Sequence, residues 1–214
     1  MEGLANTYLW AWLEPSPGYF INAEFRQQKT LDKARTLAQR AVELDGTFSE
    51  ARATLGWILF WIHGPAEGIA EFERAFEFNP NFVDGRFGLL LSHGGRAPEA
   101  IEYMKKIMRL DPLYSPRFTY LLGKGYFFTG EYEKAFELIR RAAIQMPDHR
   151  PSHVLYSAVA AHMKRTEETS AAVAEVRRIH PEFTISSWME FMRISSPDYT
   201  KRLTSGLRKA GFPE

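Results

Sequence analysis

Cysteine is absent from the 214 residues of this chain. Its absence excludes disulfide bonds, thiolate metal sites and cysteine nucleophiles. An excess of charge is missing too, because 27 basic and 26 acidic residues leave a formal net charge of +1. Such a balance produces no field that would favour nucleic acid or an anionic membrane as a partner.

Long apolar runs and targeting signals are also missing. No stretch approaches the roughly 20 apolar residues that a membrane-spanning helix needs. The N-terminal sequence MEGLANTYLWAWLEP lacks the basic region and the small-residue cleavage site of a signal peptide. A hydrophobic content of 45% is nevertheless ordinary for a globular chain that buries a core. We therefore expect a soluble, cytoplasmic protein.

Residues that could carry chemistry do not gather into a catalytic pattern. His149 and His153 have a spacing that could share a metal ion, but Pro151 lies between them and no third ligand is evident. A phosphate-binding loop follows a strand, whereas the HGG run at 93–95 does not. We expect no enzymatic activity, no metal and no cofactor.

Helix-ending residues recur at a nearly constant spacing. The run ELDG ends at Gly46, and similar runs end at Pro80, Pro112, Pro147 and Pro181. These positions are 34, 32, 35 and 34 residues apart. Proline ends a helix because it cannot donate the next backbone hydrogen bond. The spacing predicts a repeated helical unit, and repetition with this period is typical of a solenoid.

Small residues recur at two positions of the unit, one in each of its helices. These positions are filled at Gly56, Gly88 and Gly123 and at Ala34, Ala100 and Ala135. A small residue lets the backbones of two helices approach closely, while larger apolar residues fill the space beside it. The pattern therefore predicts paired helices that cross at these residues.

Local signals indicate where some of the helices begin and end. Thr47 and Glu50 have the spacing of a capping box. Ser115 and Ser196 each precede a proline, which predicts a capping serine followed by proline at the first helical position. Gly211 is expected to end the last helix.

These residues and their offsets resemble the tetratricopeptide repeat (TPR), a helix–turn–helix unit of about 34 residues. The resemblance implies an all-α, right-handed solenoid of helical hairpins. It divides the chain into a leading helix (1–14), five repeats (15–182) and a closing helix pair (183–214) that caps the solenoid. Because the leading helix has no partner, we expect a preceding half-repeat or domain in the parent protein.

Several longer stretches carry a more specific resemblance. SGLRKAGFPE, RLDPLYSPRFTYLLGKGYFFTGEYEKAFELIRRA and ELDGTFSEARATLGWILFW are similar to repeat regions attached to bacterial class III adenylate/guanylate cyclases, especially of rhizobial type. The chain contains no cyclase catalytic domain, so the resemblance implies a sensing or scaffolding arm with catalysis elsewhere. The same kind of array follows winged-helix DNA-binding domains in bacterial regulators, which leaves the parent open.

TPR arrays bind partners along a concave groove lined by the first helix of each unit, and the resemblance assigns groove positions to this chain. The assigned positions are Trp57, Phe60, Trp61, Leu89, His93, Tyr120, Lys124, Phe127 and Phe128, together with Tyr19, Ala23 and Arg26 from the first unit. Large aromatic side chains bury about 150–250 Å² each. The three aromatic residues of the second unit could therefore expose roughly 450–750 Å², which reaches or exceeds the largest apolar patch of a typical monomer.

Three alternatives remain for what covers this face. Adjacent helices of the same chain could curl inward over it, a helical or extended partner segment could bind it, or a second copy of the chain could form a homodimer. Only Lys124 and Arg26 supply charge at groove positions, with no asparagine, which disfavours a C-terminal carboxylate as the ligand. An apolar or aromatic ligand suits the groove better.

We therefore predict a non-catalytic module that binds a protein or peptide, as the C-terminal arm of a bacterial cyclase or regulator. Neither nucleic acid nor a membrane is expected as a partner. The alternative is a sensor that holds an apolar small molecule in the aromatic groove and signals by shifting helix packing.

Overall fold

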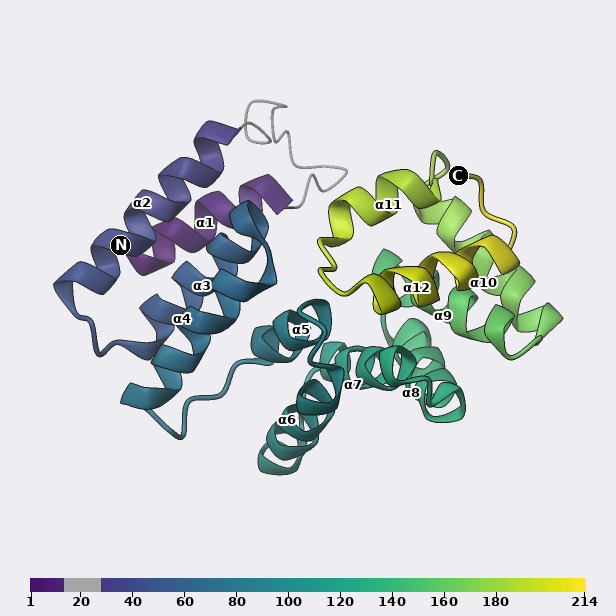
Figure 1. Ribbon diagram of the computed structural model, residues 1–214, viewed down its shortest axis with the longest axis horizontal. Helices are drawn as coiled ribbons and strands as arrows, with labels where there is room; N and C mark the ends of the chain where they lie inside the picture. The colour runs from purple at the N-terminus through teal and green to yellow at the C-terminus, as the bar shows by residue number, and fades with distance from the viewer. Residues whose placement is uncertain (14–27) are drawn as a thin grey trace. The chain divides into compact units, whose positions relative to one another are not determined.

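The structure is a computed structural model that describes residues 1–13 and 28–214. Every regular element in these two ranges is an α-helix and no strand occurs in them (Figure 1), which confirms the all-α class. The chain divides into two compact units, Met1–Asp84 and Gly85–Glu214, which we call unit 1 and unit 2. No helix in the described ranges is both long and apolar enough to cross a membrane.

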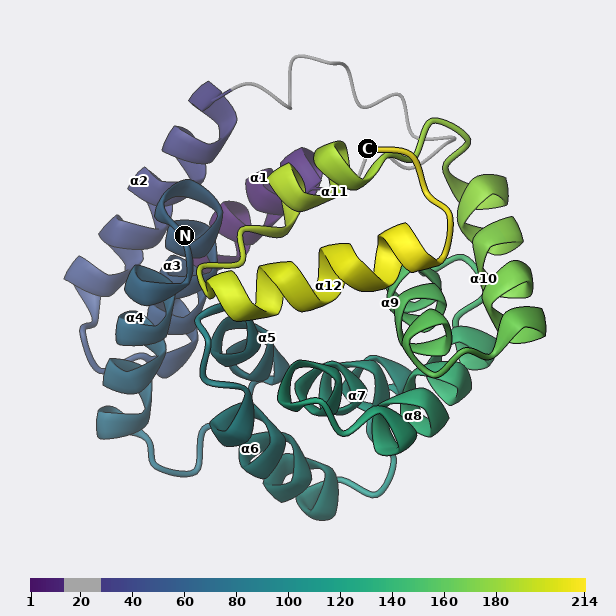
Figure 2. The ribbon, with the colours of Figure 1, turned by 45° about the vertical axis from the view of Figure 1, so that its right-hand side comes forward.

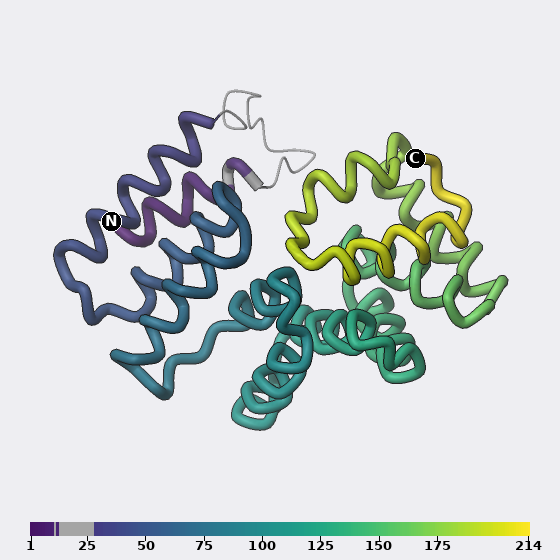
Figure 3. Tube along the Cα trace, in the orientation of Figure 1, coloured from purple at the N-terminus to yellow at the C-terminus, as the bar shows by residue number. Residues whose placement is uncertain are grey.

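Unit 1 is built from helices that pair with their neighbours in the chain. Its described helices are α1 (Glu2–Leu13), α2 (Gln28–Leu44), α3 (Ser49–His63) and α4 (Pro65–Phe78). Helix α1 packs against α2 and α3, and α3 pairs with α4, as the trace in Figure 3 shows. The sequence predicts a leading helix without a partner, whereas α1 has α2 as its partner in the structure.

The remaining predictions for the first repeat concern residues 14–27. Its first helix is expected there, and so are the groove residues Tyr19, Ala23 and Arg26. All of them lie outside the described residues.

Unit 2 contains three helical hairpins followed by two further helices. The hairpins are α5 (Gly85–His93) with α6 (Ala97–Leu110), α7 (Pro116–Thr129) with α8 (Tyr132–Gln145), and α9 (Arg150–His162) with α10 (Thr166–Ile179). Helix α7 contacts both α5 and α9, so the first helices of successive hairpins lie side by side. The second helix of each hairpin also packs against the first helix of the next, which gives the stacking of a solenoid.

The last two helices, α11 (Ile185–Met192) and α12 (Pro197–Lys209), do not close the stack as a capping pair. Helix α12 packs against α9 and runs back toward α5, and Figure 2 shows it lying across α5, α7 and α9. Its N-terminal turn is tied to the turn after α5, because the Tyr199 hydroxyl donates a hydrogen bond to the Gly95 carbonyl at 3.2 Å. The chain thus covers the first helices of its own hairpins.

The helices of a hairpin cross at the predicted small residues. A Cβ atom added at Gly56 would lie 2.8 Å from the Gly68 carbonyl oxygen, and one added at Gly123 would lie 2.7 Å from Cγ1 of Ile139. Ala34, Ala100 and Ala135, at the partner position, have no exposed surface. These observations confirm that small residues set the close approach of the helices.

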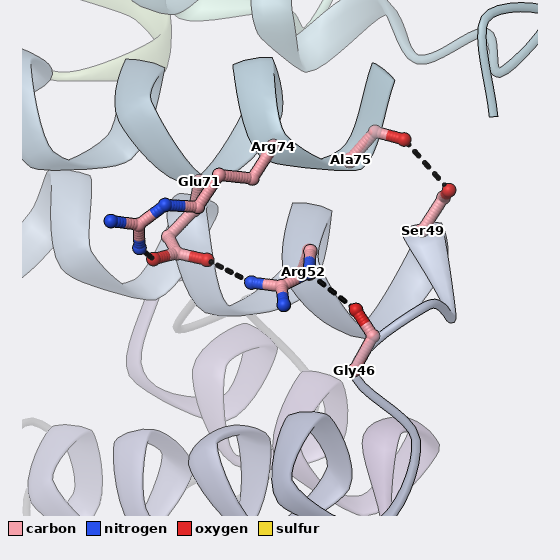
Figure 4. A network of polar contacts seen from close by, with 6 residues as sticks. All are labelled: Gly46, Ser49, Arg52, Glu71, Arg74 and Ala75. Atoms are coloured by element: carbon pink, nitrogen blue, oxygen red, sulfur yellow. Dashed lines mark hydrogen bonds and ion pairs between the residues drawn. The ribbon is translucent and has the colours of Figure 1, made fainter. Parts of the chain in front are cut away.

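A polar network adds to the contact between α3 and α4 (Figure 4). Arg52 on α3 donates to the Gly46 carbonyl oxygen at 2.6 Å and forms an ion pair with Glu71 on α4 at 3.2 Å. Arg74 pairs with the other carboxylate oxygen of Glu71. The Glu71 side chain is buried, and the two guanidinium groups supply the charge-assisted hydrogen bonds that a buried carboxylate requires.

Two of the predicted helix starts are confirmed and one is wrong. The hydroxyls of Ser115 and Ser196 accept hydrogen bonds from the first turns of α7 and α12. Thr47 does not cap a helix, because its own backbone N–H and hydroxyl donate to the Asp45 carboxylate at 2.9 and 2.7 Å. The polar groups of Thr47 are thus hydrogen-bonded within the turn, and helix α3 begins two residues later at Ser49.

Candidate functional site

The predicted groove residues of unit 1 form a buried aromatic cluster. The rings of Trp57 and Phe60 stack with centroids 5.2 Å apart, and Trp61 meets both of them edge-on. Trp12 of α1 lies 5.8 Å from the Trp61 ring. The three groove residues are at most 7% exposed, so the expectation of an open aromatic face is not met in unit 1.

In unit 2 the predicted groove residues of α5 and α7 come together on one side of these two helices. We call this side, with the adjoining side of α9, the inner face. It is defined by His93, Tyr120, Lys124, Phe127 and Phe128. All five side chains are at most 4% exposed, and only the neighbouring groove residue Leu89 is partly exposed. Contacts between neighbouring members link these five side chains into one buried cluster, so the expectation of an open face is not met in unit 2.

Helix α12 is the cover over the inner face. The Tyr199 ring stacks on the Phe128 ring with a centroid distance of 4.7 Å and an interplanar angle of 5°. Leu203 and Leu207, one and two turns further along α12, are completely buried. His162 at the end of α9 is hydrogen-bonded through Nε2 to the Arg202 carbonyl oxygen at 2.9 Å. One amphipathic helix of the same chain thus occupies the predicted groove of unit 2.

Lys124 is a buried cation at the centre of the inner face. Its amine is hydrogen-bonded to Nε2 of His93 and lies 5.8 and 5.9 Å from the ring centroids of Tyr120 and Phe128. No carboxylate pairs with it among the described residues. Burial lowers the pKa of Lys124 to about 7, because a charged amine loses its hydration in this apolar environment.

His93 links the inner face to the connection between α11 and α12. Its backbone carbonyl accepts hydrogen bonds from the Ser195 N–H at 3.0 Å and the Ser195 hydroxyl at 3.2 Å. Burial, and then the adjacent Lys124, lower the pKa of the imidazole, while the Met192 carbonyl acts in the opposite direction. His93 is therefore neutral, and a neutral imidazole can accept a hydrogen bond from the lysine.

The two histidines with metal-ligand spacing have protein partners instead. Nδ1 of His149 is hydrogen-bonded to the Ser152 hydroxyl at 2.7 Å, and Nε2 of His153 to the Pro147 carbonyl oxygen at 2.9 Å. Burial lowers the pKa of His149 to about 3. Within the part of the chain that the structure describes, no group of three or more metal-ligating side chains is assembled.

Comparison with known proteins gives matches among solved structures only. No family model matches the sequence, and no curated protein matches it. A thermophilic TPR protein in Thermus thermophilus is 17% identical with a TM-score of 0.61, over 95% of this chain and 99% of that one. PilW, a type IV pilus biogenesis factor, is 12% identical with a TM-score of 0.63, over 96% and 92%. YrrB, described as a TPR protein with an unusual peptide-binding site, is 17% identical with a TM-score of 0.53, over 83% and 94%.

The fold is that of a TPR array. At identities this low the structural similarity establishes the architecture alone, and the activities of these neighbours are not transferred to this chain. The TPR frame places the first helices of the hairpins on the inner side, and α5, α7 and α9 occupy that place in unit 2.

What sequence reasoning missed is the packing of α12 on the inner face, where the Tyr199 ring stacks on the Phe128 ring. Tyr199, Leu203 and Leu207 recur every four residues, which predicts one apolar face on the last helix. That spacing was a sufficient signal for an amphipathic helix. It carries no information about which surface the helix covers, since a capping helix and a helix lying in a groove need the same apolar stripe.

Proposed function

We propose that this TPR array is a non-catalytic scaffold that binds a helical segment of a partner protein on the inner face of unit 2. The observation that carries the proposal is the seating of α12, because the inner face holds an amphipathic helix through a stacked ring and two buried leucines. Helix-in-groove recognition uses the same contacts between separate chains. The partner is thus a helix with an aromatic and aliphatic face.

We further propose that the chain is the cytoplasmic regulatory arm of a larger bacterial adenylate/guanylate cyclase or transcriptional regulator. The support is the resemblance of SGLRKAGFPE and the upstream stretches, and the structure gives this run a packing role. Phe212 lies 4.7 Å from the Phe183 ring, and the Pro213 carbonyl accepts a hydrogen bond from the Ile185 N–H at 2.8 Å. The run therefore fastens the end of α12 to the start of α11.

The alternative function, sensing of an apolar small molecule, is less well supported. The aromatic side chains that would surround such a ligand are buried against α12 in unit 2 and against one another in unit 1. A protein helix matches the occupant already present, so the scaffold is the function we propose.

Site-specific photo-crosslinking in the native host tests the scaffold. A photoreactive phenylalanine analogue replaces Leu89, the partly exposed groove residue, or Leu113, which is 92% exposed in the turn before α7. We expect adducts at Leu89 that map to one helical segment of a second polypeptide, and none at Leu113. Adducts that are equally abundant at both positions, or that form only at Leu113, would contradict partner binding on the inner face.

A further inference from the structure

We propose that α12 and the partner helix compete for the inner face of unit 2, and that the partner reproduces the contact pattern of α12. This inference rests on the proposed scaffold function and specifies the partner. The pattern is an aromatic residue at i, leucines at i+4 and i+8, and a glycine or other small residue at i+7. In α12 these positions are held by Tyr199, Leu203, Leu207 and Gly206.

The aromatic position is specified by two contacts at one end of the inner face. The Tyr199 ring lies flat on the Phe128 ring, and its hydroxyl reaches the Gly95 carbonyl. A tyrosine satisfies both contacts, because its ring is apolar and its tip is a hydrogen-bond donor. A partner helix with tyrosine at this position would make the same pair of contacts.

The small residue is specified by the helix crossing at the other end. A Cβ atom added at Gly206 would lie 2.9 Å from Cβ of Ala158, from the Ala158 carbonyl oxygen and from the His162 ring. Two of these three neighbours are a backbone atom and the first side-chain atom of a helix, which do not move aside easily. A large side chain at this position therefore holds the helix away from α9.

Most of the remaining hydrogen bonds to α12 and its connection involve a backbone group, and one joins two side chains, Nζ of Lys209 and Nδ1 of His162 at 3.3 Å. His162 is bonded to the Arg202 carbonyl oxygen, and the His93 carbonyl accepts from Ser195. Any helix presents carbonyl groups, so the backbone contacts do not select the side chains of α12, and the Lys209 contact is exposed to solvent. Selectivity lies in the four positions of the pattern, and a partner that carries them can take the place of α12.

Two features make α12 separable from the array. It belongs to none of the hairpins that build the stack, and it is joined to α11 by residues 193–196, which contain no helix. In this connection Arg193 has a φ of 47°, a left-handed conformation that is uncommon for a residue other than glycine. Arg193 is the C-cap of α11, so the chain leaves that helix and turns toward α12 at this residue.

A labelled peptide tests the competition with intact chains. The probe is the synthetic helix SPDYTKRLTSGLRKAG, residues 196–211, followed by fluorescence anisotropy against three versions of the 214-residue chain. The wild-type protein should bind it weakly, because a tethered helix acts at an effective concentration in the millimolar range. The Gly206→Leu protein, whose own α12 cannot seat but whose inner face is unaltered, should bind it at least tenfold more tightly. Lys201→Leu, on the exposed side of α12, should behave like the wild type.

The matched peptides sharpen the result. A peptide that carries Gly206→Leu should not bind the Gly206→Leu protein, whereas a peptide that carries Lys201→Leu should bind as the unmodified one does. Equal binding of the probe to all three proteins would place it on another surface and overturn the inference. A folded Gly206→Leu protein that does not bind the probe would overturn it as well.

A second variant covers the case in which Gly206→Leu does not fold. The double substitution Tyr199→Ala and Leu203→Ala removes contacts of α12 without adding volume. The resulting protein should bind the probe as tightly as the Gly206→Leu protein does. If both proteins unfold, α12 is an indispensable part of the core and the inference is wrong. A wild-type dimer with exchanged α12 helices, detected by light scattering and crosslinking, would make a second copy the occupant and also overturn it. The Leu89 crosslinking experiment tests the scaffold separately from all of these outcomes.

Discussion

Lys124 titrates in a pH range where lysine is ordinarily fully charged. An unfolded lysine keeps its proton up to a pH of about 10.4, whereas in the folded protein the pKa of Lys124 is about 7. Between these two values the unfolded chain binds more protons than the native one. The free energy of unfolding therefore rises as the pH increases from 7 to 10.

We expect Lys124→Met to remove this rise. Methionine has a similar length and no charge, so the variant should be more stable than the wild type at pH 7 by about 1–4 kcal/mol. Its stability should then change much less between pH 7 and 10. Urea unfolding followed by circular dichroism measures both quantities. Lys106→Met, an exposed lysine of α6, is the control and should keep the wild-type slope.

The sequence predicts which residues lie together on the inner face, but it does not predict that these residues are buried. The TPR offsets brought His93, Tyr120 and Lys124 together, because residues at equivalent positions of stacked repeats share a face. Burial depends on α12, which begins 73 residues further along the chain than Lys124, and no local spacing reports such a contact. Thr47 shows a similar limit at short range, since the same threonine serves a capping box or an Asx turn equally well.

Among the elements, the hairpins depend on crossing points that admit no side chain. Gly56 in α3 faces backbone of α4, so a methyl group there meets a carbonyl oxygen that cannot rotate away. Gly3 in α1 has nothing within 4 Å of the position that a Cβ would occupy. Gly3 and Gly56 thus differ in packing, although both are helical.

We expect Gly56→Ala to lower the free energy of unfolding by about 1–3 kcal/mol, because overpacking pushes α3 and α4 apart. Gly3→Ala should be neutral or stabilising by up to about 1 kcal/mol, since alanine favours the helix over glycine. Thermal and urea unfolding of the two proteins side by side provide the measurement. An equal loss in both variants would mean that helix propensity, and not the crossing, determines the effect.

Helix boundaries were the most predictable feature at this scale. The prolines that follow α4, α6, α8 and α10 lie within a few residues of the observed ends, because proline is tolerated in the first turn of a helix but cannot continue it. Helix partners were less predictable. Helix α1 pairs with α2 and α12 lies across the inner face, and either helix could have packed elsewhere with the same apolar stripe.

At the scale of the whole molecule, the histidines make stability depend on pH. Burial is the main cause of a lowered pKa at five of them, all in unit 2, namely His93, His149, His153, His162 and His180. Below a pH of about 6.5 the unfolded chain takes up protons that these native histidines do not yet bind. Stability is therefore lost as the pH falls below that value.

We expect the midpoint of thermal unfolding to fall steadily between pH 7 and 5. Hydrogen exchange should show amides of residues 85–214 losing protection over this range before those of the described part of unit 1, because the shifted histidines all lie in unit 2. The sixth histidine, His63, belongs to unit 1. Loss of protection in unit 1 first, or a midpoint independent of pH, would contradict this account.

Tryptophan is divided very unequally between the two units. Four of the five indoles in the chain belong to residues 1–84, and Trp188 of α11 is the fifth. Intrinsic fluorescence therefore reports mainly on unit 1, whereas far-ultraviolet ellipticity is summed over the helices of both units. The native protein thus carries most of its fluorescent side chains in unit 1. A Trp188→Phe substitution restricts the tryptophan emission to that unit. Emission and ellipticity recorded on one sample then separate the unfolding of the two halves without any added dye.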